Sequence, residues 1–140
     1  MVNKNNYYIM KKKDLVFGLE QEMKIKETIE NFFNIKIKKS KNKFCKYDFK
    51  GKGIRIELKS RRINSDAYPT TLLCKTKIDY YNKIKDKKKF ILIFNFLDKI
   101  KYLEFNEDLL NLPLKKIYVK RGEIVENIEI DINLLKDLSD

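Results

Sequence analysis

Hydrophobic and polar residues alternate strictly in one short segment near the middle of the chain. In Ile54-Arg55-Ile56-Glu57-Leu58-Lys59 the apolar side chains occupy every second position. Because successive side chains of a strand point to opposite faces, this alternation predicts a half-buried strand over about 53–61. The preceding segment 43–50 is interpreted as a second strand, and Gly51-Lys52-Gly53 as the turn of a hairpin.

Two other patterns predict helices. Residues 14–33 place apolar side chains on one side at helical spacing, at Leu15, Leu19, Met23, Ile29, Phe32 and Phe33. A second helix is predicted over about 72–86, with Cys74, Ile78 and Tyr81 on its inner side. Tyr68-Pro69-Thr70-Thr71 before it supplies a breaker and an N-cap.

The segment Phe90–Leu97 is almost continuously apolar, which predicts a strand covered on both faces in the middle of a sheet. Asp98-Lys99 is a predicted turn, and 100–105 pairs back as a hairpin strand. The remaining expectations are a short strand or clasp at 7–10, a strand or helix end at 35–38, a short helix at 107–112, strands at 117–119 and 125–132, and a helical turn at 134–138.

The order helix, strand, strand, helix, buried strand, strand predicts an α/β protein. One mixed central sheet flanked by helices on its faces follows from that order. With 140 residues and no internal repeat, we expect a single domain. Its core covers roughly 14–106, and 107–140 forms a β-rich C-terminal extension.

The chain is strongly basic, with 32 Lys and Arg against 20 Asp and Glu and a formal charge of +12. Such a surplus favours a polyanionic partner, and nucleic acid is the first candidate. The alternative is compositional, because an AT-rich genome makes Lys, Asn and Ile abundant through its codons.

The residue types exclude several chemistries. The chain has no His, which removes His-based triads, His-metal sites and a His general base. Zinc is not expected with only Cys45 and Cys74 as soft ligands, and their spacing matches no redox motif. The N-terminal residues lack the apolar core of a signal peptide, and no apolar run is long enough to span a membrane. We therefore expect a soluble, intracellular protein.

Asp48, Glu57 and Lys59 are the candidate chemical residues. The alternation sends Glu57 and Lys59 to one face, and the short hairpin lays Asp48 beside them. Two carboxylates can hold a hard divalent cation, and a neighbouring lysine can help to generate a metal-bound hydroxide. The alternative is a solvated sheet face with cross-strand ion pairs, which contribute under about 1 kcal/mol each.

Glu22 lies inside the apolar sector of the first predicted helix. A carboxylate on a buried side is costly unless a charged group meets it, and a metal ion would serve. The alternative is an ion pair with Lys26, four residues further on.

These residues resemble a known superfamily. Asp48 followed by Glu57-Leu58-Lys59, with Glu22 on the preceding helix, is similar to the motif of the restriction-endonuclease-like nucleases, PD-(D/E)XK. The resemblance covers roughly 18–97 and includes the order helix, strands, helix, strand. The segments Glu57–Arg61 and Tyr68–Thr71, with Lys77, resemble small nuclease-like proteins of large DNA viruses and phages. The chain departs from the motif at Tyr47, where the superfamily name has Pro.

The resemblance implies roles for individual residues. Asp48 and Glu57 would bind Mg²⁺ or Mn²⁺, the Leu58 carbonyl would complete the ligand set, and Glu22 would be the acid of the first helix. Lys59 would orient or deprotonate the attacking water. Lys77 and Tyr81 would face the site from the second helix, where some members carry Gln and Tyr.

Basic residues close to these positions are candidate DNA contacts: Arg61, Arg62, Lys75 and Lys77, together with Tyr81. Lysine and arginine bind phosphates without regard to sequence, although any single lysine can equally be a solvated side chain. Because no recognition helix or zinc module is present, we expect structure-selective or nonspecific cutting.

The function expected from these inferences is Mg²⁺-dependent hydrolysis of DNA in recombination, repair or genome processing, in the host cytoplasm or nucleus if the chain is viral. Two alternatives remain, namely an inactive nuclease-fold DNA-binding protein and an interaction protein with an incidental basic surface. A homodimer is a further expectation, with the segment 124–135 as its interface or, equally, as part of the core.

Overall fold

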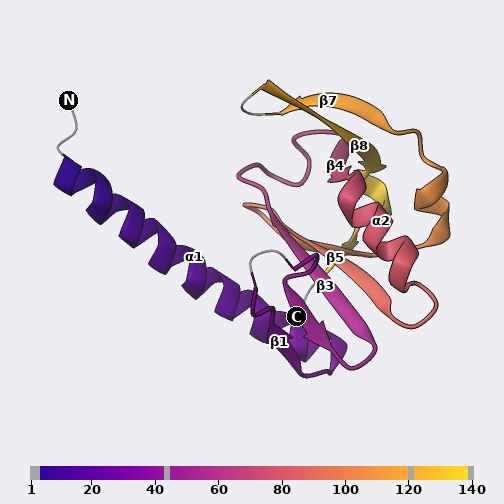
Figure 1. Cartoon of the computed structure of the whole chain (residues 1–140). Coiled ribbons are helices and arrows are strands. Elements are labelled where there is room, and N and C mark those ends of the chain that lie inside the picture. The colour runs from indigo at the N-terminus through magenta and orange to yellow at the C-terminus, as the bar shows by residue number, and fades with distance from the viewer. Residues whose placement is uncertain (1–3, 43–44, 120–121, 139–140) are drawn as a thin grey trace. The chain divides into compact units, whose positions relative to one another are not determined.

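A computed structural model describes residues 4–42, 45–119 and 122–138. The chain divides into two compact units, one up to Lys36 and one from Ile37 onward. The structure is mixed α/β, with two α-helices in the described residues (Figure 1). No helix in these residues combines the length and the apolar composition that crossing a bilayer requires.

The first unit consists mainly of α1, Lys4–Phe33. The helix ends at Phe33, and the Asn34 that follows it has a left-handed φ of 53°. The Ile35 N–H donates to the Glu30 carbonyl at 3.2 Å. This is a Schellman-type C-cap, in which Asn replaces the more common Gly. Residues 7–10 belong to this helix, so the predicted strand or clasp was wrong. The prediction of the buried side of α1 was also partly wrong, because Leu19 and Met23 on that side are exposed.

A six-stranded sheet organises the second unit. Its order is β1 (Ile37–Lys39), β2 (Phe49–Gly51), β3 (Ile54–Ser60), β5 (Lys89–Asn95), β6 (Ile100–Glu104) and β9 (Lys136–Asp137). The β3–β5 pair is parallel and the other pairs are antiparallel. The prediction of a mixed central sheet with a buried strand at its middle is therefore confirmed.

The β2–β3 hairpin is shorter on its β2 side than predicted. Strand β2 pairs with β3 only at Ile54–Ile56, and residues 45–48 lie outside β2. Residues 43 and 44 of the predicted strand lie outside the described residues. Gly53 has a φ of +69° in the tight turn, a conformation that glycine adopts at little cost. The part of β3 from Glu57 onward therefore extends past the end of β2.

A second sheet was not predicted. It has the order β4 (Thr70–Cys74), β8 (Glu123–Asp131) and β7 (Lys115–Val119), and all its pairs are antiparallel. The helix α2 starts at Lys75 and ends at Ile84, with Cys74 as N-cap. The prediction that residues 70–71 cap this helix was wrong. The two threonines instead begin strand β4, and β-branched residues such as threonine favour strands.

The C-terminal segments were predicted unevenly. A 3₁₀ helix, Glu107–Asn111, lies within the predicted helix at 107–112. The predicted helical turn at 134–138 is instead a 3₁₀ turn, Ile132–Leu134, followed by β9. This last strand pairs with β6 and closes the edge of the large sheet.

The main core of the second unit lies where one face of β5 and β6 meets α2 and the small sheet. Its fully buried members include Leu73, Phe90, Leu92, Phe94 and Ile130. Ile128 and Ile130 belong to this core, so part of the segment 124–135 is interior, whereas Ile124 is exposed. The dimer itself stays a prediction.

Candidate functional site

The register of β3 against β5 decides where Glu57 lies. Glu57 pairs with Leu92, and Arg55 and Lys59 pair with Phe90 and Phe94. Paired residues of neighbouring strands share a face, so the polar side chains of β3 point to the same side as the apolar core residues of β5. Glu57 is consequently only 5% exposed, at the border between the core and the polar part of β3.

Asp48 reaches the same part of β3 from the segment before β2. Its backbone N–H donates to the Ile56 carbonyl at 2.8 Å, which extends the hairpin by one residue. Its carboxylate Oδ2 accepts a hydrogen bond from the Leu58 N–H at 2.7 Å. The side chain thus takes the place that a further β2 residue would have filled.

The Leu58 carbonyl lies on the same strand edge. In an extended strand the N–H and C=O of one residue point to the same side. The Leu58 N–H points to Asp48 and away from β5. The Leu58 carbonyl therefore projects from the same edge of β3, past the Phe49–Ile56 pair where the ladder with β2 ends. Oxygens of Asp48, Glu57 and Leu58 are therefore available in one neighbourhood.

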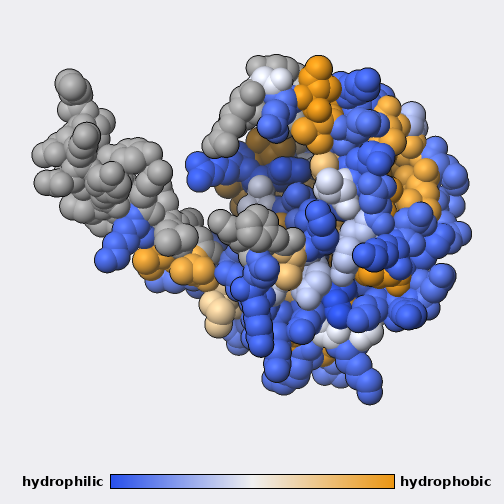
Figure 2. Space-filling model, in the orientation of Figure 1, coloured by the Kyte–Doolittle hydropathy of each residue, from blue (hydrophilic) through white to orange (hydrophobic). Residues whose placement is uncertain are grey.

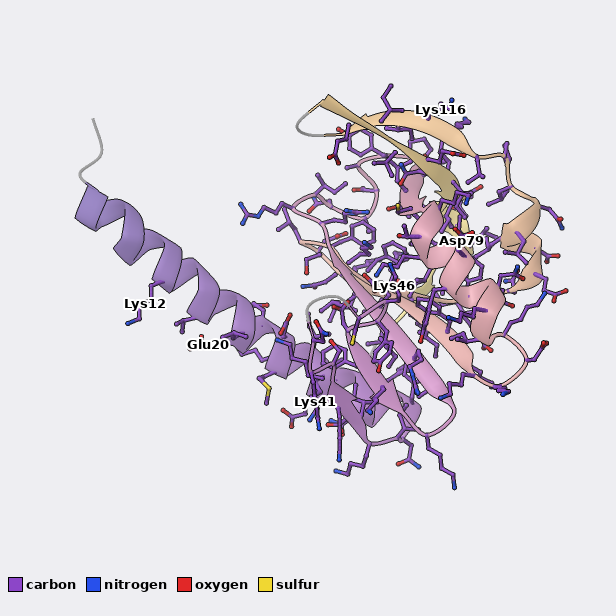
Figure 3. The ribbon with its side chains drawn as sticks, viewed as in Figure 1. Lys12, Glu20, Lys41, Lys46, Asp79 and Lys116 are labelled. Atoms are coloured by element: carbon purple, nitrogen blue, oxygen red, sulfur yellow. The ribbon has the colours of Figure 1, made fainter. Side chains whose placement is uncertain are left out.

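Two lysines surround the Glu57 carboxylate. The Lys77 Nζ, from the first turn of α2, lies 2.9 Å from Glu57 Oε2 and donates to the Lys46 carbonyl at 3.1 Å. The Lys59 Nζ lies 3.6 Å from Glu57 Oε1. Figure 3 shows Lys46 near α2, which also carries Asp79. The segment before Asp48 is in this way fastened to α2.

The pKa of Glu57 is raised above its ordinary value of 4.5. Burial is the largest cause, and the nearby charge of Asp48 acts in the same direction. The hydrogen bond and charge of Lys77 and the charge of Lys59 oppose both effects without cancelling them. A charged Glu57 is therefore under-compensated by the protein alone.

The site residues fit a hard divalent cation by their chemistry. Mg²⁺ prefers oxygen ligands, uses one or two carboxylates and keeps several waters. Two carboxylates and a backbone carbonyl meet that requirement. Within the described ranges no group of three or more His, Cys, Asp and Glu side chains is placed to hold a metal, so the carbonyl and water would have to supply the other ligands.

The structure does not bring every predicted residue to this cluster. Tyr81 is 7% exposed and belongs to the core, with its ring 4.2 Å from that of Phe105. This burial is at odds with a direct contact between Tyr81 and nucleic acid. Glu22 lies half-buried on α1, in the other unit, and its part in the site stays a prediction.

The predicted DNA contacts differ in their freedom to bind phosphate. Arg62 is exposed. The Lys75 ammonium pairs with Asp79 at 3.0 Å, one turn further along α2. The Arg61 guanidinium donates to the Leu72 carbonyl at 3.2 Å, which ties the loop after β3 to β4. Lys77 is the one of the four that contacts Glu57 directly.

A group of side chains next to the site was not predicted. The Arg55 guanidinium lies 5.1 Å from the centre of the Tyr47 ring, and the centres of the Tyr47 and Tyr80 rings are 6.2 Å apart. The signal was present in the spacing, since Arg55 precedes Glu57 by two strand positions and Tyr80 follows Lys77 by one helical turn. Which of the two adjacent tyrosines faces Tyr47 and which enters the core depends on the exact rotation of the helix about its axis. Tyr80 faces Tyr47, and Tyr81 is buried in the core.

No protein-family model matches the chain, and no curated protein and no solved structure matches it significantly.

Proposed function

We propose that this chain is a metal-dependent nuclease with a restriction-endonuclease-like core. The observation that carries the proposal is the position of Glu57, a buried carboxylate beside Asp48 on the part of β3 that extends past β2. Burying a partly compensated carboxylate costs free energy of folding, and a bound divalent cation would offset that cost.

The topology supports the same proposal. The order of α1, the β2–β3 hairpin, α2 and the central β5 agrees with the resemblance to this superfamily. Strand β3 is parallel to β5, and the chain between them passes through β4 and α2. This connection carries Lys77 back to the acidic end of the hairpin.

In the proposed site Asp48, Glu57 and the Leu58 carbonyl would hold Mg²⁺ or Mn²⁺. Such a cation would lower the pKa of a bound water and offset charge on the scissile phosphate. The Leu58 N–H fixes the Asp48 carboxylate, so one ligand is oriented before any cation arrives. Lys59 presents its ammonium beside Glu57 and stabilises negative charge that develops on the phosphate.

The proposed substrate is DNA. The charge of +12 favours a polyanion, and hydrophilic residues predominate on the face of the second unit that Figure 2 shows. Arg62 is exposed on the loop that follows β3, where it can meet phosphates near the site. Sequence-independent contacts of this kind fit structure-selective or nonspecific cutting in recombination, repair or genome processing.

A second candidate function is DNA binding without hydrolysis. The observation that favours it is the ion pair between Lys77 and Glu57, which already offsets part of the Glu57 charge without a cation. Such a protein would bind DNA with a steep salt dependence and leave it intact.

The experiment that distinguishes the two is a cleavage assay on duplex, single-stranded and branched DNA, with and without Mg²⁺ or Mn²⁺. We expect the wild type to cut at least one substrate with metal only, and Glu57→Ala to cut none. Glu104→Ala, at an exposed position of β6, is the matched control and keeps wild-type activity. Intact DNA in every lane, together with salt-sensitive binding, would replace the nuclease proposal with the binding function.

A further inference from the structure

The Lys77 ammonium lies between two oxygens, Glu57 Oε2 at 2.9 Å and the Lys46 carbonyl at 3.1 Å. A carboxylate and a carbonyl oxygen are the donor types that a hard cation prefers. The lysine side chain is 16% exposed, and the Glu57 side chain is 7% exposed. Most of the lysine side chain is therefore covered, and its ammonium contacts the carboxylate that the proposed metal would need.

The formal charges of the cluster sum to zero without a metal, although burial still raises the pKa of Glu57. Asp48 and Glu57 contribute two negative charges when ionised, and Lys59 and Lys77 contribute two positive charges. A divalent cation on the two carboxylates would leave the cluster with a net charge of +2. Like charges repel one another more strongly where water is scarce, so a cation and the Lys77 ammonium would compete for Glu57 Oε2.

Lysine can leave such a position by rotation of its side chain alone, which would release the contacts with Glu57 and the Lys46 carbonyl. Its ammonium is carried on a flexible four-carbon stem, and Lys77 lies in the first turn of α2. A DNA phosphate near the site would give the displaced ammonium a new partner. Binding of the cation and binding of DNA would then support one another.

We propose that Lys77 is an internal counter-ion that occupies Glu57 in the metal-free protein and moves to a substrate phosphate when a divalent cation binds. This inference rests on the proposed function, because it takes the Glu57 site to be the metal site. It assigns to Lys77 the coupling of metal affinity to nucleic-acid binding.

The first test is a calorimetric titration of Mn²⁺ into the wild type, Lys77→Gln and Lys77→Arg without DNA. Gln removes the competing charge and keeps an N–H donor for Glu57, so Mn²⁺ should bind about ten-fold more tightly, a difference of about 1.4 kcal/mol. Arg keeps the competing charge, so the Lys77→Arg protein should bind Mn²⁺ no more tightly than the wild type. Lys83→Gln removes an exposed lysine of the same helix and serves as the charge-matched control.

A second test uses the unaltered protein. Acylation of lysines by an activated ester, followed by mass spectrometry, measures how accessible each ammonium is. Mg²⁺ alone should accelerate the modification of Lys77 several-fold and leave that of Lys83 unchanged. This measurement decides the question even where a Lys77 variant does not fold.

The outcomes separate this inference from the proposed function. Equal Mn²⁺ affinity in the wild type and Lys77→Gln, with unchanged Lys77 acylation, overturns the inference while metal-dependent cleavage would still uphold the nuclease. Tighter Mn²⁺ binding by Lys77→Gln without cleavage by any variant upholds the inference and rejects the nuclease. If no variant binds Mn²⁺, both proposals fail.

Discussion

Two carboxylates of the second unit, Glu57 in β3 and Asp98 in the turn after β5, meet opposite surroundings. Asp98 accepts hydrogen bonds from the Ser65 N–H at 2.7 Å and the Ser65 Oγ at 2.8 Å, and its pKa is lowered chiefly by the backbone bond. The pKa of Glu57 is raised, chiefly by burial. The fold therefore favours the charge of Asp98 and disfavours that of Glu57.

The difference distinguishes a structural carboxylate from a candidate functional one. Asp98 fastens the loop after β3 to the β5–β6 turn, and the Leu97 N–H strengthens the same junction by donating to the Ile63 carbonyl at 3.0 Å. Glu57 instead forms ion pairs with two flexible lysine side chains. Carboxylates with this kind of perturbed pKa are concentrated at functional sites.

The largest expected effect separates the two carboxylates by activity. Glu57→Gln keeps the shape of the side chain and removes a proposed metal ligand, so metal-dependent cleavage should fall more than about 1,000-fold. Asp98→Asn removes the same charge from the structural junction and should cut at nearly the wild-type rate. Single-turnover cleavage of the best DNA substrate measures both. Similar rates for the two variants would remove the functional distinction.

The next effect concerns the lysine beside Glu57. Lys59→Gln removes positive charge near the scissile phosphate and should slow cleavage about 100-fold with little change in DNA affinity. Lys89→Gln, at an exposed lysine of β5, is the control. The same single-turnover assay, combined with a binding titration, checks this. A loss of affinity that accounts for the whole rate change would make Lys59 a DNA-binding residue only.

A smaller effect is expected on the structural side of the comparison. Ser65 is 6% exposed, and Ser65→Ala removes the Oγ–Asp98 hydrogen bond while the backbone bond stays. The free energy of unfolding should fall by about 1 kcal/mol. Urea denaturation measures it, and unchanged cleavage by this variant is part of the prediction. Reduced cleavage at unchanged stability would assign the junction to the active site.

The smallest effects are the pH dependences of stability, which should have opposite signs. Because the pKa of Glu57 is raised in the folded protein, its contribution to the free energy of unfolding is present below pH 4.5. That contribution is lost as the pH rises through the folded-state pKa. Because the pKa of Asp98 is lowered in the folded protein, its contribution to the free energy of unfolding is present above pH 3.8. That contribution is lost as the pH falls through the folded-state pKa. Denaturation of the metal-free wild type, Glu57→Gln and Asp98→Asn across this range tests both signs. If the free energy of unfolding changed with pH in the same way in both variants, the predicted opposite signs would be contradicted.

The sequence predicted the elements that have a strong period or a long apolar run. The alternation in 54–59 and the apolar segment Phe90–Leu97 correspond to β3 and to the central β5. The burial of Ile78 and Tyr81 was also predicted, since both follow helical spacing. Segments without such a signal were predicted poorly. Thr70–Cys74 became a strand because it pairs with β8, which lies about 55 residues further along the chain.

The site shows the same limit. The hairpin turn and the alternation were sufficient to predict that Asp48, Glu57 and Lys59 gather at one place. The burial of Glu57 was not predicted, because it depends on the register of β3 against β5. The resemblance alone predicted that Lys77 faces the site. Its ion pair with Glu57 was not predicted, because it depends on the path of the chain through β4 and α2.

The most direct test of the central claim, that Asp48 and Glu57 hold a divalent cation, is calorimetric titration of Mn²⁺ into the wild type, Asp48→Asn and Glu57→Gln. We predict one Mn²⁺ site per wild-type chain and an affinity that is at least about ten-fold weaker in each variant. Asp98→Asn should bind Mn²⁺ as the wild type does. Equal Mn²⁺ binding by all four proteins, or no binding by any, would contradict the account.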